Sequence, residues 1–146
     1  MELDDSHFMK QALKLAVQAA EEDEVPIGAV VILNNQIIGK GYNQTKKLED
    51  ATAHAEMIAL TAAFQYLGST ILDECKLYVT IEPCSMCAGA LKWARIGEVI
   101  YGAPEEKSGY TLYTPSLLHP KTKVKKGALH EECAMIMSQF FEAKRG

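Results

Sequence analysis

Apolar and polar positions recur along the chain with two different periods, and each period predicts a different kind of element. From residue 6 to residue 21 the apolar side chains recur at helical spacing, which predicts a first helix. Asp5 or Ser6 can cap its N-terminus. The apolar stripe of this helix consists of Phe8, Ala12, Leu13, Ala16 and Ala20.

Shorter apolar runs bounded by turn residues predict strands. The stretch IGAVVILNNQIIGKGYN indicates two strands joined by a turn at Asn34-Asn35, which is the pattern of a β-hairpin. KLYVTI at residues 76–81 is rich in strand-forming side chains. EVIYG at residues 98–102 and TKVKKG at residues 122–127 indicate a fourth and a fifth strand.

Helical periodicity returns between these strands. Residues 53–67 predict a helix that ends at Gly68 and carries one apolar face of Met57, Leu60, Phe64 and Leu67. A third helix is expected over residues 84–94, and the last one repeats Leu129, Cys133, Ile136 and Phe140. Helices that alternate with strands after an opening hairpin favour an α/β fold, in which helices cover both faces of a mixed sheet.

Length and composition favour a single globular domain over residues 1–146. Apolar residues make up 48% and charged residues 23% of the chain, as is usual for a globular protein. No apolar run approaches the roughly 18 residues of a membrane span. The start, MELDDSHFMK, lacks the pattern of a signal peptide. We therefore expect a cytoplasmic protein that does not enter a membrane, in which a Cys pair binds metal or takes part in catalysis.

The charge of the chain is uneven. The net charge is −4, yet KTKVKK at residues 121–126 holds four lysines and no acid. Such a segment can attract phosphate even on an acidic protein. The same lysines are equally typical of a solvated edge strand that is kept from aggregating. Both interpretations are consistent with the sequence.

The segment VTIEPCSMCAGAL places Cys84 and Cys87 directly after a strand and Pro83. Three interpretations of this Cys-x-x-Cys pair compete. Thioredoxin-like redox enzymes place such a pair at a helix start, where the thiol pKa is lowered. A structural zinc site would need four protein ligands, and only Cys75 or Cys133 could add a further thiol. A catalytic zinc site needs three protein ligands and one open position for water.

A third ligand decides between them. His54 and Glu56 occur in TAHAEMIAL, at the start of the second predicted helix. Positions two apart differ by about 200° around a helix, so these side chains converge only on a point beyond the helix N-terminus. The Cys pair also begins a helix, and two positive helix ends suit thiolates. We therefore predict that His54, Cys84 and Cys87 ligate a catalytic zinc ion and that Glu56 moves protons for its water.

Several stretches resemble the cytidine/deoxycytidylate deaminase superfamily, whose zinc signature is His-x-Glu with Pro-Cys-x-x-Cys. The resemblance runs from about residue 6 to residue 141 and is closest to the bacterial tRNA-specific adenosine deaminases, mainly through EVPIGAVV and EPCSMCAGA. The other matching stretches are GYN, TAHAEM, LYVTIEPCSMCAGAL, RIG, YGA and the terminal FF.

The resemblance implies a three-layer α/β/α cytidine-deaminase-like fold with a five-stranded mixed sheet, and a homodimer. It implies one zinc ion per chain, and substrate contacts from Asn43, with Ile27 and Ala55 in the pocket. The reaction would convert the wobble adenosine of a tRNA anticodon arm to inosine with release of ammonia. The alternative is a deaminase of a free nucleobase, guanine or cytosine, with the same zinc site.

Some positions are left open by the sequence. The family usually has small residues after Lys-Thr-Gly-Ala, where this chain has KSGYTLY at residues 107–113. Tyr110 and Tyr113 could therefore stack on bases or could pack in the core. Cys75 and Cys133 are expected to be small buried side chains. Trp93 and Met86 could serve the dimer interface or the core.

Overall fold

A computed structural model describes residues 3–145 of the chain. All the elements expected from the sequence are present in the expected order. They are α1 (Asp5–Glu21), β1 (Gly28–Leu33), β2 (Gln36–Tyr42), α2 (Ala55–Leu67), β3 (Lys76–Ile81), α3 (Ser85–Ala94), β4 (Glu98–Ala103), the short 3₁₀ helix η1 (Tyr110–Leu112), β5 (Lys123–Lys126) and α4 (His130–Arg145).

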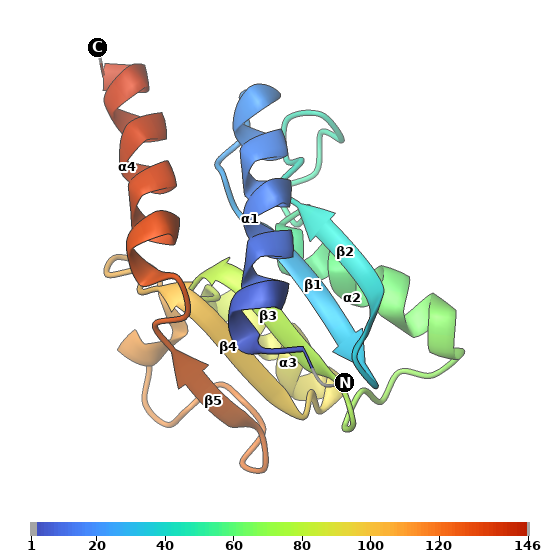
Figure 1. The fold of residues 1–146 in the computed structure, drawn as a ribbon. Helices are drawn as coiled ribbons and strands as arrows, with labels where there is room; N and C mark the ends of the chain where they lie inside the picture. Colours follow the sequence, from blue (N-terminus) through green and yellow to red (C-terminus); the bar gives the residue numbers. More distant parts are fainter. Residues whose placement is uncertain (1–2, 146) are drawn as a thin grey trace.

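The strands form one five-stranded sheet in the order β2-β1-β3-β4-β5. β1 runs antiparallel to both of its neighbours, whereas β3, β4 and β5 are parallel to one another. The sheet is therefore mixed, as predicted. Because β3, β4 and β5 run in the same direction, the segments that follow these three strands all start at the same end of the sheet (Figure 1).

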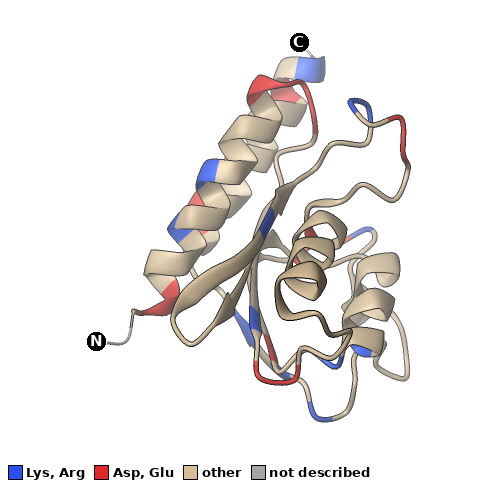
Figure 2. Ribbon diagram, turned by 90° about the vertical axis from the view of Figure 1, so that its right-hand side faces the viewer, with Lys and Arg blue, Asp and Glu red and all other residues tan. Residues whose placement is uncertain are grey.

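Helices cover both faces of this sheet. α1 and α4 lie on one face and α2 and α3 on the other, and the edge-on view separates the three layers (Figures 1 and 2). Side chains of neighbouring strand residues point to opposite faces of the sheet, so they pack into two different hydrophobic cores. Leu77 and Val79 pack under α2 and α3, whereas Tyr78 packs with Phe8 and Met9 of α1. The three-layer α/β/α fold predicted from the sequence is confirmed.

The hairpin turn has the conformation that its residues favour. Asn34 and Asn35 both have positive φ, 49° and 67°. Two positive φ angles in a two-residue turn give the type I′ geometry, which fits the twist of a hairpin. The predicted turn is therefore confirmed, and it sets the register in which Leu33 pairs with Gln36.

Helix starts differ slightly from the prediction. α1 is capped by Asp4, whose carboxylate accepts a hydrogen bond from the His7 N–H at 2.9 Å, and not by Asp5 or Ser6. α2 begins at Ala55 rather than residue 53, so His54 is the N-cap residue and not part of the first turn. His54 has an extended backbone conformation, so the helix begins only after it.

The buried face of α2 also differs from the predicted one. Of the four large apolar residues expected to face the core, only Leu60 is fully buried, and the helix rests on the small side chains of Ala55, Ala59 and Ala63. The reason is close contact with β2. A Cβ atom on Gly39 would lie 2.3 Å from the carbonyl oxygen of Ala59. Large side chains have no room between these backbones.

A similar contact on the other face gives a first testable prediction. A Cβ atom on Gly28 would lie 2.0 Å from the carbonyl oxygen of Ala12 in α1. Gly28→Ala must push α1 away from the sheet, and we expect it to lower the free energy of unfolding by about 1–3 kcal/mol. Urea denaturation measures this change.

Gly89→Ala in α3 is the matched control. Nothing lies within 4 Å of its added Cβ, and alanine favours a helix interior over glycine by about 1 kcal/mol. Equal unfolding midpoints for the two variants would show that the contact between α1 and β1 tolerates a methyl group.

Among the described residues, no helix is both long and apolar enough to cross a membrane. The last helix, α4, is the least buried of the long helices. Only Cys133 of this helix is fully buried, and it packs against the backbone of β4 at Gly102.

Candidate metal centre

Two helix N-termini place the candidate ligands. His54 is the N-cap residue of α2 and Cys84 that of α3, and both have extended backbone conformations. Neither side chain accepts a capping hydrogen bond from its own helix. The imidazole and the thiol are therefore directed elsewhere. Cys87 lies in the first turn of α3 and is fully buried.

The three side chains meet at one point. Nδ1 of His54 lies 3.6 Å from Sγ of Cys84 and 3.6 Å from Sγ of Cys87. All three atoms lie within 4.8 Å of one another, and this is the one candidate metal-binding group within residues 3–145. A tetrahedral zinc ion with Zn–S of about 2.3 Å and Zn–N of about 2.0 Å separates N from S by about 3.5 Å. The donor set and its spacing therefore fit zinc.

The three candidate ligands shift one another's pKa values. A hydrogen bond from Cys87, and a weaker effect of His54, lower the pKa of Cys84 to about 4. The hydrogen bond with Cys84 raises the pKa of His54. The pKa of Cys87 is raised because it donates to Cys84 and is buried. A thiolate thus forms at Cys84 first, and a bound cation would replace the remaining protons.

Glu56 lies beside this group, as its predicted role requires. Glu56 is only 3% exposed, and it lies close enough to Cys84 and Cys87 for each to affect its pKa. Burial raises its pKa to about 7, with a smaller contribution from the negative charge of Cys84. A carboxyl group with a pKa near neutrality can both take up and release a proton during a reaction.

Asn43 is held rigidly next to His54 and Glu56. Its side-chain oxygen accepts a hydrogen bond from the Ala55 N–H at 2.8 Å, and its own backbone N–H donates to the Ile27 carbonyl at 3.1 Å. Because a backbone N–H requires an oxygen partner, the first bond fixes which end of the amide faces the helix. Asn43 therefore presents its NH₂ group as a donor for another molecule. Ile27 is half-buried between the two cores.

Two buried glutamates support the site and were missed by sequence reasoning. Glu24 accepts hydrogen bonds from the backbone N–H groups of Lys46 and Lys47, at 3.2 and 2.9 Å. It thereby fixes the loop that joins Asn43 to His54. Glu82 organises a second loop, described below. Each is followed within two residues by proline. This pattern is a weak indicator of a buried glutamate, because the burial depends on loops formed by residues much later in the chain.

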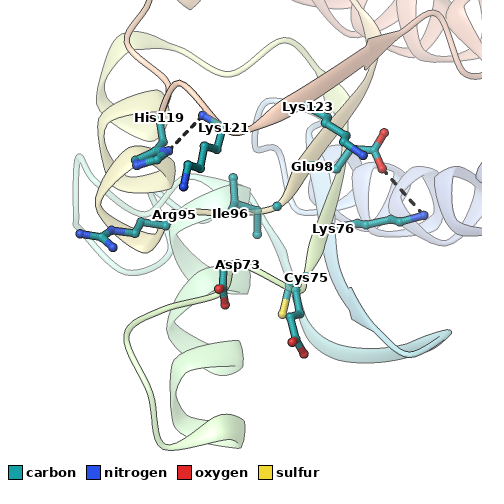
Figure 3. A pocket seen from close by; sticks show the side chains of 11 residues that line it. Asp73, Cys75, Lys76, Arg95, Ile96, Glu98, His119, Lys121 and Lys123 are labelled. Atoms are coloured by element: carbon teal, nitrogen blue, oxygen red, sulfur yellow. Dashed lines mark hydrogen bonds and ion pairs between the residues drawn. The ribbon is translucent and has the colours of Figure 1, made fainter.

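A separate cavity of about 620 Å³ lies at the opposite end of the sheet (Figure 3). Lys76, Glu98 and Lys123 begin the three parallel strands and line it, whereas Cys84 follows the last residue of β3. Cys75 also borders this cavity, and burial raises its thiol pKa. As predicted, Cys75 is a buried side chain, and it is remote from the candidate ligands.

Part of KTKVKK, including Lys121 and Lys123, lies at that remote end. Lys125 forms ion pairs with Asp5 and Glu98, at 3.7 and 3.6 Å. Lys123 lines the cavity just described. The sequence left open whether these lysines attract phosphate or keep an edge strand soluble. The edge-strand interpretation fits them better, since β5 is the edge of the sheet and is exposed.

The remaining open positions divide between core and surface. Tyr110 is buried and packs edge to face against Tyr101, with ring centroids 6.4 Å apart, so it is a core residue. Tyr113 is exposed. Burial raises the thiol pKa of Cys133 to about 12, as expected for a packing residue. Trp93 is 84% exposed and is not part of the core of this chain.

Comparisons with known proteins agree on one family. The family model of MafB19-like deaminases matches residues 3–145. A tRNA-specific adenosine deaminase of Agrobacterium fabrum is 43% identical over 96% of this chain and 95% of its own length. A solved structure from a study of A-to-I editing by tRNA:A34 deaminases has a TM-score of 0.84 and 42% identity, covering 90% of this chain and 99% of that one. A guanine deaminase from Bacillus subtilis has a TM-score of 0.67 and 39% identity, covering 70% of this chain and 66% of the other.

Proposed function

We propose a reaction on the premise that the chain belongs to the deaminase family and, within it, to the tRNA-specific adenosine deaminases. This membership confirms the family expected from the sequence motifs and sets aside the redox interpretation of the Cys pair. The proposed reaction is hydrolysis of the adenine amino group at the wobble position of a tRNA anticodon arm. The products are inosine and ammonia.

His54, Cys84 and Cys87 are the residues proposed to hold one zinc ion per chain. The observation that carries this proposal is the equal spacing of 3.6 Å from Nδ1 to each sulfur, with the buried Glu56 beside it. Zinc supplies a Lewis acid that makes a water molecule acidic at neutral pH. With His54, Cys84 and Cys87 as its protein ligands, the ion would keep one position open for water, as catalytic zinc sites do.

Glu56 is proposed to move the protons. It takes one proton from water as the water oxygen bonds to C6 of adenine, and it delivers this proton to the ring nitrogen N1. It then takes the second proton of the same oxygen and passes it to the amino group, which leaves as ammonia while the C6 carbonyl forms. Each transfer requires a carboxyl group that is neither strongly acidic nor permanently protonated, and the pKa of about 7 meets this condition.

Asn43, Ile27 and Ala55 are proposed to place the base. The NH₂ group of Asn43 donates to an acceptor on the nucleoside, because its oxygen is engaged by Ala55. Ile27, whose carbonyl accepts a hydrogen bond from the Asn43 N–H, is proposed to form an apolar wall of the pocket. Ala55 is fully buried, so its part is to hold the Asn43 side chain in place through its N–H.

A groove on the α4 face, at the same end of the sheet as the metal-binding group, offers room for nucleotides of an RNA substrate. Its cavity of about 630 Å³ lies between α4 and residues 104–107. It borders Ile81 and Ala103, the last residues of β3 and β4, which lie at the same end of the sheet as Cys84. Lys107 and Arg145 line it and can contact phosphates, and Glu105, Glu106 and Glu142 line it as well. A free base would need no such groove, whereas nucleotides that flank the target adenosine would. Action on tRNA would place the enzyme in the cytoplasm.

Ammonia release from a panel of substrates tests this proposal. The panel is an anticodon stem-loop with adenosine at the wobble position, the same stem-loop with guanosine there, and free adenosine, guanine and cytosine. We expect ammonia from the first stem-loop and inosine at its wobble position. Turnover of free guanine or cytosine with none of the stem-loop would overturn the RNA substrate and favour the likeness to guanine deaminase.

The active form is proposed to be a homodimer formed through α2 and α3. Apart from the buried Glu56, these helices contain one charged residue, Lys92. The layer that they form is therefore mostly tan, with little blue or red, in Figure 2. Trp93 projects beside a cavity of about 280 Å³ that Met57 and Phe64 also line. A largely uncharged surface with an exposed aromatic side chain and an adjacent pocket suits self-association.

Trp93→Glu is expected to shift the chain from dimer to monomer. Trp residues at the centre of an interface contribute at least about 2 kcal/mol, which corresponds to about 30-fold in the dissociation constant. Sedimentation velocity over a range of concentrations measures the change. Ile71→Glu is the control, because Ile71 is also exposed but lies in the loop after α2. A monomeric unaltered chain, or a Trp93→Glu variant that still dimerises, would remove this interface.

A further inference from the structure

Glu82 stands directly before Pro83 and the candidate ligand Cys84, and its carboxylate is 4% exposed. No lysine or arginine of residues 3–145 forms an ion pair with it. Its oxygens instead accept hydrogen bonds from the Glu105 N–H at 3.1 Å, the Thr111 N–H at 3.0 Å and the Thr111 hydroxyl at 2.7 Å. A carboxylate buried without a cation requires such donors, so the loop and the carboxylate depend on each other.

The loop that Glu82 holds lies against the metal-binding group. Gly109 forms an isolated β-bridge with Cys84, and the Tyr110 N–H donates to the Pro83 carbonyl at 2.9 Å. The fit is tight, because a Cβ atom on Gly109 would lie 2.1 Å from a carboxylate oxygen of Glu82. Residues 105–111 are thus fastened to residues 82–84 through both backbone and side chain.

Two consequences follow for the site. The segment that carries Cys84 cannot shift without the loop, since the backbone bridge and the Glu82 hydrogen bonds join them. The loop also extends from the groove that Lys107 lines to the backbone of Cys84. It therefore connects the surface proposed for flanking nucleotides with the position of the reacting base.

We propose that Glu82 is a positioning residue for the deamination: its carboxylate fixes residues 105–111 beside Cys84, and so aligns the base with the groups that attack it. The inference rests on the proposed function, but the link between Glu82 and the loop does not need a substrate. Misplacement of a reacting group by about 1 Å can cost on the order of 100-fold in rate. A loose loop should therefore lower kcat even in a folded, metal-loaded enzyme.

Glu82→Gln and Thr111→Val test the link from its two sides. The glutamine keeps the size of the side chain but turns an NH₂ group toward one of the N–H donors. The valine removes only the hydroxyl donor. Thr122→Val is the matched control, because the Thr122 hydroxyl donates to the Ile96 carbonyl at 2.7 Å and borders the opposite end of the sheet. Each variant is measured for zinc content, kcat on the stem-loop, and hydrogen exchange of the amides of residues 105–111.

We expect Glu82→Gln to retain zinc, to exchange these amides about 10-fold faster or more, and to lower kcat by about 10- to 100-fold. Thr111→Val should change both quantities in the same direction, and Thr122→Val should change neither. Unchanged exchange in Glu82→Gln, or an unchanged kcat with only a lower melting temperature, would overturn the inference. An unaltered chain that releases no ammonia would instead refute the proposed function, and exchange alone would still decide whether Glu82 holds the loop.

Discussion

Glu56→Gln is expected to lower kcat for deamination by about 10²- to 10⁴-fold, the range that a positioned proton-transfer group supplies. Glutamine has nearly the same shape, so it fills the buried site of a side chain that is 3% exposed. It cannot take up a proton from water, and it cannot deliver one to the base. The loss should therefore appear in kcat, while the affinity for the stem-loop changes little.

Metal content separates this role from that of a ligand. We expect Glu56→Gln to keep one zinc ion per chain, because the atoms that surround the metal position come from His54, Cys84 and Cys87. Glu74→Gln, an exposed carboxylate at the other end of the sheet, is the control and should leave kcat unchanged. Near-normal turnover of Glu56→Gln would remove Glu56 from the reaction, and loss of zinc would make it a ligand.

Cys87→Ala is expected to remove zinc and to reduce deamination to background. A site with two ligands cannot hold zinc in the tetrahedral arrangement that three protein ligands and water provide. The loss should be larger than that of Glu56→Gln, because both the metal and its acidic water disappear. Elemental analysis of the purified protein and inosine formation on the stem-loop measure the two effects.

Cys75→Ala is the matched control for this variant. Cys75 is as deeply buried as Cys87, but it borders the cavity at the opposite end of the sheet. It should keep zinc and activity. A Cys87→Ala protein that retains its zinc would contradict the assignment of the ligands. A folded, metal-free natural chain with a reversible disulfide between Cys84 and Cys87 would restore the redox interpretation.

Local sequence patterns were sufficient to predict the features that depend mainly on neighbouring residues. The turn at Asn34-Asn35 follows from two residues that tolerate positive φ. The metal-binding group follows from His54 and Cys84 at helix starts, because helix geometry alone limits where their side chains meet. The mixed sheet with helices on both faces follows from helices and strands that alternate after an opening hairpin.

Features that depend on contacts between distant segments were not predictable in the same way. The α2 face was assigned to large side chains, but the glycines of β2 bring the backbones so close that Ala59 and Ala63 fill the contact. Glu24 and Glu82 read as ordinary surface acids until the loops that donate to them are in place. The sequence left open whether Lys125 attracts phosphate, and its ion pair with Asp5 joins two segments far apart in the sequence.

Deamination of the stem-loop in water enriched in ¹⁸O tests the central claim most directly. If water attacks C6 with Glu56 as the proton carrier, each base that loses ammonia must gain one oxygen atom from the solvent. We expect ¹⁸O-labelled inosine at the wobble position in an amount equal to the ammonia released, and little of it from Glu56→Gln over the same time. Unlabelled inosine, ammonia without labelled inosine, or equal labelled product from Glu56→Gln would contradict this mechanism.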